Sequence, residues 1–282
     1  MCPLVFLLFA ILSSSVLAVV LKYLNAAYSY GVYFINYVTC AALAFLTLEE
    51  KSLYNGDPAP LWLGAIAGFF YLASLTASGY SIHKNGAVLS SVFTRLGVLV
   101  PIGVSILWFG ERPTPVQALG VALAVAAALV MNGLPGKDRQ KAAPKAVYLV
   151  PLLLTLVLNG ATDSMSKIFT QLGRREDDGL FVLYIFLFAA LFTLGLLFKE
   201  RQPFSKRDLL FGVLVGVPNF FSSRLLLAAL TELPAFVTYP AYSVGAILTI
   251  SVLSFFLFRE CLNRRQLFAV GMILCALVLL NL

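Results

Sequence analysis

The sequence predicts an all-α integral membrane protein in which ten transmembrane helices form two inverted five-helix repeats around a central cavity. Three observations lead to this prediction. Apolar runs of about 20 residues, the length that crosses a bilayer, follow one another along the chain. The 282 residues are 60% hydrophobic and 12% charged, whereas a soluble domain has about 25% charged residues. Finally, the second half of the chain repeats features of the first.

Short polar connections that carry charges and turn residues separate the apolar runs. The first run lacks the charged start of a signal peptide and is longer than the apolar part of one, so we interpret it as a membrane helix. The ten predicted spans are 3–22, 30–48, 60–82, 86–109, 114–133, 146–170, 179–198, 207–230, 235–257 and 265–281.

The most polar connection, 134–145, divides the chain into a first repeat over 1–133 and a second over 146–282. Because five is odd, two related halves must enter the membrane from opposite sides, as in many secondary transporters. The charge bias of the loops favours both termini outside, but orientation stays open. Three polar residues recur after the same 149 residues: Glu111 as Glu260, Gln117 as Gln266 and Asn132 as Asn281.

Charge and motif content exclude several classes of function. The net charge of +7 is typical of loop lysines and arginines near anionic lipid, and no basic patch interleaves with aromatics as in nucleic-acid binding. The four cysteines form no CxxC pair, which argues against a metal or disulfide framework. No HExxH, GxSxG or Walker sequence is present. We therefore predict no enzyme, no cofactor and no metal.

Charged residues inside the predicted spans point to function. A charge at the bilayer centre costs roughly 2.5–3.5 kcal/mol, so each needs a partner. Arg95 lies near the middle of 86–109, and its candidate partners are Asp163, backbone carbonyls, hydroxyls such as that of Thr94, or a substrate anion. Asp163 and Arg224 are expected at similar depth in parallel helices, so an ion pair between them is a second prediction.

A polar face is predicted on the span 146–170. Asn159, Asp163 and Lys167 follow one another at a spacing of one helical turn. Asp163 is a candidate for a substrate cation or a proton. Lys167 is either functional or extends to the interface by snorkelling.

Glu111 and Glu260 fall at the ends of spans beside turns. We interpret them as carboxylates stabilised by the dipole of the helix that follows, with proton coupling as the alternative.

The paired segments "FGERPTPVQALGVALAVAAALVM" and "FRECLNRRQLFAVGMILCALVLL" share an aromatic residue, a Glu, a short turn, a Gln and a helix rich in small residues. With "SIHKNGAVLSSV" and "TELPAFVTYPAY", they make the whole chain resemble the ten-helix EamA-type branch of the drug/metabolite transporter superfamily. The resemblance implies a central cavity lined mainly by the first, third, fourth, sixth, eighth and ninth helices, and transport by alternating access. The tryptophan-glycine common in the first helix of the family is absent here, and Ser13, Ser14 and Ser15 stand nearby.

Aromatic, proline and glycine residues fit this scheme. Pro101, Pro218 and Pro240 are expected to curve their helices. Small residues four apart predict close packing between helices of one molecule, as in the pairs Gly64 with Gly68 and Gly212 with Gly216. The predicted substrate-binding residues are Arg95, Asp163, Arg224, Asn159, Thr94, Tyr71, Tyr239, Tyr242 and Ser14.

The predicted function is secondary transport of a small polar metabolite, either an amino acid, another zwitterion or an organic anion. Two alternatives stay open: export of organic cations or drugs through Asp163, aided by tyrosines, and translocation of a lipid or lipid-linked substrate. The expected partners are the substrate, a proton, the bilayer and no nucleic acid. A monomer is expected, with a homodimer as the alternative, in the cytoplasmic membrane of a bacterium.

Overall fold

The structure is a computed structural model, and every regular element among the residues it describes is helical. Its described residues are 3–23, 29–48, 53–54, 56–85, 90, 93–94, 96–132, 149–201, 204–258 and 264–280.

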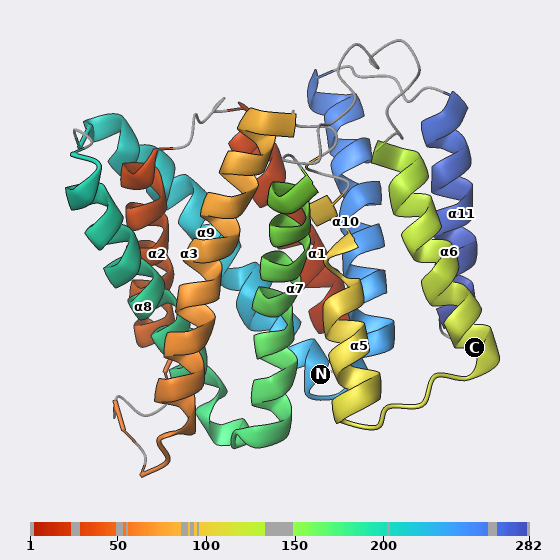
Figure 1. The fold of residues 1–282 in the computed structure, drawn as a ribbon, viewed down its shortest axis with the longest axis horizontal. Helices are drawn as coiled ribbons and strands as arrows, with labels where there is room; N and C mark the ends of the chain where they lie inside the picture. The colour runs from red at the N-terminus through yellow and green to blue at the C-terminus, as the bar shows by residue number, and fades with distance from the viewer. Residues whose placement is uncertain are drawn as a thin grey trace. The chain divides into compact units, whose positions relative to one another are not determined.

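Within these ranges lie ten α-helices and one short 3-10 helix (Figure 1). Each predicted apolar span contains one α-helix, so the all-helical fold class and the helix positions are confirmed. The helices are α1 (Pro3–Tyr23), α2 (Tyr30–Leu46), α3 (Ala59–Asn85), α5 (Leu99–Trp108), α6 (Pro115–Asn132), α7 (Leu149–Leu172), η3 (Arg175–Asp177), α8 (Asp178–Lys199), α9 (Lys206–Leu230), α10 (Ala235–Phe258) and α11 (Arg264–Leu280).

The fourth predicted span differs most from the structure. The sequence predicts one helix over 86–109. The described residues 90, 93–94 and 96 are helical, but a turn at Gly97 and Val98 interrupts the span before α5 begins at Leu99. Pro101 therefore lies in the first turn of α5, where a backbone N–H has no helical partner to lose, and not in mid-helix as expected. By contrast, Pro218 and Pro240 do lie inside α9 and α10.

Five helices are long and apolar enough to cross a bilayer by length and composition, namely α1, α3, α7, α8 (with the preceding 3-10 turn) and α9. The other α-helices contain shorter apolar segments. Large apolar side chains are exposed along the helices; Leu107 and Trp108, for example, are 86% and 82% exposed. Lipid tails are as apolar as such side chains, so this exposure is what a lipid-facing surface requires.

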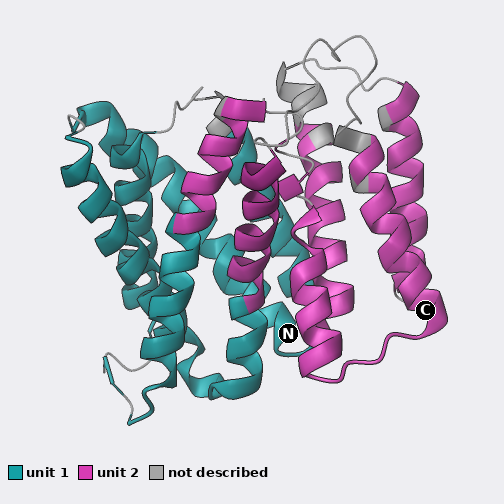
Figure 2. Ribbon diagram, viewed as in Figure 1, with its two compact units in different colours: residues 1–72, 165–232 teal, residues 73–164, 233–282 magenta. Residues whose placement is uncertain are grey.

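The described helices form two compact units (Figure 2). Unit 1 comprises residues 1–72 and 165–232, and unit 2 comprises residues 73–164 and 233–282. Each unit thus combines helices from both halves of the sequence, and the long helices α3 and α7 contribute residues to both units.

In unit 1, α2 packs against α9 at two glycines. The α9 residue Gly212 faces Ile35 of α2, and a Cβ added to Gly216 would lie 2.7 Å from the Cβ of Thr39. Real Cβ atoms do not approach this closely, so only glycine permits the backbones to come together here. The prediction that this glycine pair serves packing within the molecule is confirmed.

A second glycine contact joins α3 to α8. A Cβ on Gly64 would lie 2.5 Å from the Cβ of Tyr184, and one on Gly68 would lie 2.8 Å from the carbonyl oxygen of Ile185. These contacts confirm the second predicted pair.

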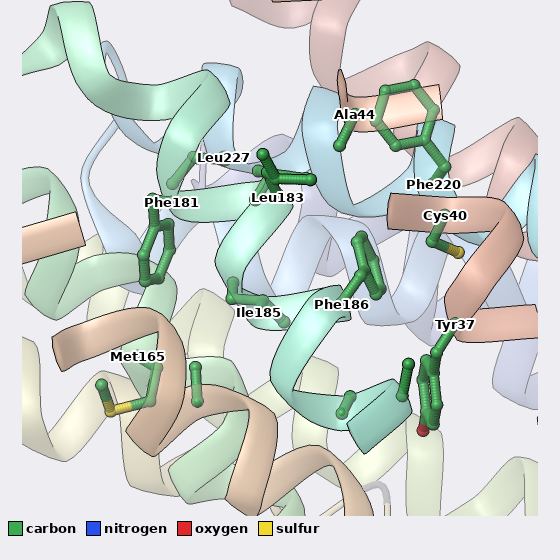
Figure 3. Packing of buried hydrophobic residues seen from close by; sticks show 14 of the residues in the cluster. Tyr37, Cys40, Ala44, Met165, Phe181, Leu183, Ile185, Phe186, Phe220 and Leu227 are labelled. Atoms are coloured by element: carbon green, nitrogen blue, oxygen red, sulfur yellow. The ribbon is translucent and has the colours of Figure 1, made fainter. Parts of the chain in front are cut away.

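The core of unit 1 is rich in aromatic rings (Figure 3). Phe169 of α7 stacks on Phe181 of α8 with ring centroids 4.0 Å apart. Phe186 of α8 lies 6.3 Å from Tyr37 of α2, measured between ring centroids. Since aromatic pairs add about 0.5–1.5 kcal/mol beyond their area burial, these contacts join α2, α7 and α8.

In unit 2, α6 packs against α11 through small residues. A Cβ on Gly120 would lie 3.1 Å from the Cβ of Leu279. Ala124 and Ala127 of α6 are buried with Ile273 and Ala276 of α11.

Candidate functional site

Asp163 lies on α7 in unit 2 and is half-buried. Its backbone carbonyl accepts a hydrogen bond from the hydroxyl of Tyr239 on α10. Tyr239 is only 1% exposed, and it directly precedes Pro240, which lies inside the same helix. The structure therefore brings two of the predicted site residues together and ties α10 to α7 at Asp163.

One turn before Asp163, Asn159 links α7 to α3. Its amide nitrogen donates to the hydroxyl of Ser78 at 3.1 Å and to the carbonyl of Thr155 at 2.8 Å. Both contacts lie in unit 2. Ser78 was not among the predicted site residues. Its position in the sequence of α3 does not indicate that it contacts a residue on another helix.

The segment around Arg95 approaches the same part of α7. Arg95 itself lies outside the described residues, as do residues 91–92. Thr94 is described, and its hydroxyl donates to the carbonyl of Ser90 at 3.0 Å, within its own helical turn. A Cβ on Gly160 would lie 2.5 Å from the carbonyl oxygen of Gly97, so the chain at Gly97 packs tightly against α7.

Lys167 is buried in unit 1, with 3% of its surface exposed. A snorkelling lysine extends its ammonium group to the surface, so the snorkelling alternative for this residue is wrong. In the sequence, the spacing of four residues from Asp163 predicts that Lys167 lies on the same face of the helix.

Arg224 lies on α9 in unit 1 and is half-buried. Its terminal nitrogen Nη2 lies 4.0 Å from the position that a Cβ on Gly179 would occupy. In the part of the chain that the structure describes, its guanidinium has no hydrogen-bond or ion-pair partner, although the carboxylate of Asp178 interacts with it electrostatically. The predicted pair between Asp163 and Arg224 joins residues of different units and stays a prediction.

Asp178 is a site residue that the sequence analysis missed. It stands at the first position of α8, and its Oδ1 atom is buried without a hydrogen-bond partner among the described residues. In the sequence it falls in "GRREDDG", which is typical of a solvated connection. The adjacent Gly179, which leaves room for Arg224, was the only local signal.

Ion pairs surround this end of unit 1. Arg174 pairs with Asp177 at 3.0 Å and with Asp57 at 3.4 Å. Arg175 pairs with Glu232, just beyond the end of α9. These pairs connect the turn between α7 and α8 to the segment before α3 and to the end of α9.

The remaining predicted site residues are on α1, α3 and α10. Tyr71 lies 3.4 Å, hydroxyl to hydroxyl, from Ser223, the residue before Arg224, and its ring contacts Phe186 at 5.8 Å between centroids. Tyr242 and Ser14 are half-buried. The neighbouring Ser15 is fully buried and donates to the carbonyl of Ile11 at 2.7 Å.

Glu111 caps a helix, but not the helix that was expected. Its two carboxylate oxygens accept from the backbone N–H of Ala235 at 3.0 and 3.2 Å. Ala235 is the first residue of α10, whereas the helix that follows Glu111 in the chain is α6. The carboxylate of Glu111 therefore interacts with the dipole of α10 and not, as expected, with that of α6. Glu260 lies outside the described residues.

Among the described residues, no group of three or more His, Cys, Asp or Glu side chains is arranged to hold a metal ion. The polar groups described above suit a polar or charged organic ligand, because they are guanidinium, carboxylate, amide and hydroxyl groups on membrane helices.

Comparisons with known proteins agree with this architecture. Residues 148–282 match the model of the EamA-like transporter family. A crystal structure of another protein aligns with 98% of this chain and 94% of its own, with a TM-score of 0.79 and 15% sequence identity. At that identity, the alignment shows a shared fold alone. No curated protein matches the chain.

Proposed function

Because the chain belongs to the EamA-like transporter family of the drug/metabolite transporter superfamily, we propose that it is a secondary transporter for a small polar metabolite with an anionic group. Amino acids, other zwitterions and organic anions are the substrate class. Transport would proceed by alternating access in the cytoplasmic membrane of a bacterium. The family and the apolar helices already identify a membrane transporter, and the substrate class is the part we propose.

Arg224 is the observation that carries the substrate class. A guanidinium at the centre of a membrane helix costs roughly 2.5–3.5 kcal/mol on insertion scales, and charged residues within membrane helices are normally paired. Arg224 lies within α9, six residues before its end. Among the described residues Arg224 has no hydrogen bond or ion pair, although it interacts electrostatically with the carboxylate of Asp178. A substrate carboxylate or phosphate, bound through two parallel N–H···O bonds, would supply the missing partner.

Arg95 and Asp163 remain predicted ligands. Gly97, two residues after Arg95 in the sequence, lies close to Gly160 of α7, which is three residues before Asp163. In a zwitterionic substrate, Asp163 would bind the ammonium group.

The glycine contacts of unit 1 support the proposal of two related halves. Gly212 and Gly216 follow Gly64 and Gly68 by 148 residues, and their contact residues Ile35 and Tyr184 are 149 residues apart. In the first contact a helix of the second half packs on α2 of the first half. In the second contact the roles are exchanged, as a two-fold related pair of repeats requires.

A thermal-shift screen of the purified full-length protein tests the proposal. The probes are L-glutamate, succinate, glycine and tetraethylammonium. A ligand at 100 times its Kd stabilises the folded protein by about 2.7 kcal/mol, which raises the Tm by roughly 5–10 °C for a chain of this size. We expect a carboxylate-bearing probe to stabilise the wild type and to lose this effect in Arg224→Gln.

Arg207→Gln is the matched control, because Arg207 is exposed at the start of the same helix. It should respond to ligand as the wild type does. Equal stabilisation of wild type and Arg224→Gln by the same carboxylate would contradict the role of Arg224. Stabilisation by tetraethylammonium alone would favour the alternative of cation export through Asp163.

A further inference from the structure

Asp178 and Arg224 carry opposite charges and interact electrostatically, but among the described residues no hydrogen bond or ion pair joins them. The Oδ1 atom of Asp178 is buried without a hydrogen-bond partner, and Arg224 has no ion pair within 4.0 Å among the described residues. The two are nevertheless close, since Nη2 of Arg224 lies 4.0 Å from the Cβ position of Gly179, the next residue after Asp178.

A buried carboxylate oxygen without a hydrogen-bond donor is energetically costly, because it has lost its contacts with water and gained none in return. Two changes lower this cost: a neighbouring cation compensates the negative charge, or the carboxylate takes up a proton. Which of these occurs at Asp178 depends on the charged groups around it.

Three charged residues interact electrostatically with Asp178. Two of them form ion pairs with other residues. Arg175 is paired with Glu232, and Asp177 is paired with Arg174. Arg224 is the third, and no ion pair joins it to a carboxylate among the described residues. The charged state of Asp178 therefore depends on Arg224 more than on its other neighbours.

We propose that Asp178 is the proton-binding carboxylate of the transport cycle and that it exchanges Arg224 for a proton when substrate binds. The anionic group of the substrate pairs with Arg224. Asp178, deprived of its cation, accepts one proton from water and forms an O–H bond. When the substrate leaves, Asp178 returns that proton to water on the side to which the substrate is released, and Arg224 compensates its charge again. No electron transfer is involved.

This proposal rests on the proposed binding of an anionic group by Arg224. Substrate and proton then favour each other's binding, because both act through one residue and linkage is reciprocal. Lower pH increases the fraction of protonated Asp178, which leaves Arg224 available to the substrate. The affinity for the anion should therefore rise as the pH falls, by at most about tenfold per pH unit for one coupled proton.

The first test needs no ligand. Arg224→Gln removes the cation as substrate would, so infrared spectroscopy at pH 7 should show the carbonyl-stretch band of a protonated carboxyl group. The band should vanish in the double variant with Asp178→Asn, and it should be absent in Arg224→Lys, which retains the charge. If Arg224→Gln shows no band that Asp178→Asn removes, the proposal is overturned.

The second test measures the Kd of the carboxylate probe between pH 5.5 and 8. The wild type should bind more tightly as the pH falls, whereas Asp178→Asn should bind with a constant Kd close to the wild-type value at low pH. Glu176→Gln, an exposed neighbour in η3, is the control and should keep the wild-type slope. This test also applies if Arg224→Gln does not fold.

The outcomes separate the two proposals. If Arg224→Gln abolishes anion binding but Asp178→Asn keeps the wild-type pH dependence, anion transport stands and the proton role of Asp178 is wrong. If Arg224→Gln binds the anion as tightly as the wild type, the proposed function fails, and the coupling through Asp178 fails with it.

Discussion

The carboxylate of Glu111 accepts the backbone N–H of Ala235, the first residue of α10, across 124 positions of sequence. A carboxylate at a helix N-terminus satisfies a donor that has no partner in the helix and interacts favourably with the helix dipole. Glu111 follows α5 and precedes α6, so this one side chain fixes the connection between them to the start of α10.

Replacement of Glu111 by alanine should therefore destabilise unit 2. Loss of a helix cap costs about 0.5–2 kcal/mol, so Glu111→Ala should lower the Tm in detergent by a few degrees. Glu111→Gln keeps an acceptor oxygen and should lose less. Glu176→Ala, at an exposed position, should leave the Tm unchanged. Equal Tm values for all three variants would show that the cap contributes no stability.

Gly216→Ala should destabilise the contact between α2 and α9, because the new methyl group would lie 2.7 Å from the Cβ of Thr39. Overpacking of this kind costs about 1–3 kcal/mol. Gly195→Ala on α8 is the matched control, since nothing lies within 4 Å of its Cβ position and alanine favours a helix over glycine by up to about 1 kcal/mol. The two variants should shift the Tm in opposite directions, and a stabilised Gly216→Ala would be incompatible with the close contact.

Tyr239→Phe removes one hydroxyl and leaves the ring in place. The backbone carbonyl of Asp163 then loses a donor, at a cost of about 1 kcal/mol. A drop in Tm of a few degrees is expected, whereas Tyr80→Phe, at a position 56% exposed, should be neutral. If both tyrosine variants unfold at the same temperature, the link between α10 and α7 contributes little.

Lys167 should resist acylation by a water-soluble amine reagent in the folded protein, because it is 3% exposed. Lys199 and Lys206 are exposed and should react readily, as quantified by mass spectrometry of peptides. Unfolding in detergent with urea should make Lys167 as reactive as the other two. Rapid modification of Lys167 in the folded state would restore the snorkelling alternative.

The positions of the helices could be predicted from the sequence because a membrane span requires a continuous apolar run of about 20 residues. The same reasoning missed the interruption of the fourth span, because the turn at Gly97 before α5 does not break the apolar pattern. Hydropathy measures how well each residue suits lipid, and glycine in a turn suits it as well as glycine in a helix.

The site was predictable only within single helices. The spacing of Asn159, Asp163 and Lys167 predicts a polar face of α7, but it does not predict the hydrogen bond to Ser78 or the contact between Tyr239 and the backbone of Asp163. Asp178 was missed for a related reason, since its burial beside Arg224 depends on α9, which begins 28 positions later in the chain. The spacing of residues along one sequence shows which of them share a helix face, but it does not show which residues of other helices they contact.

The reciprocal glycine contacts mean that neither half of the polypeptide is self-sufficient. A chain cut in the linker 134–145 would yield two pieces, each with a glycine face whose complement is on the other piece. The contact between α2 and α9 can therefore form only after α9 has been synthesised, so unit 1 cannot be completed from the first half of the chain alone.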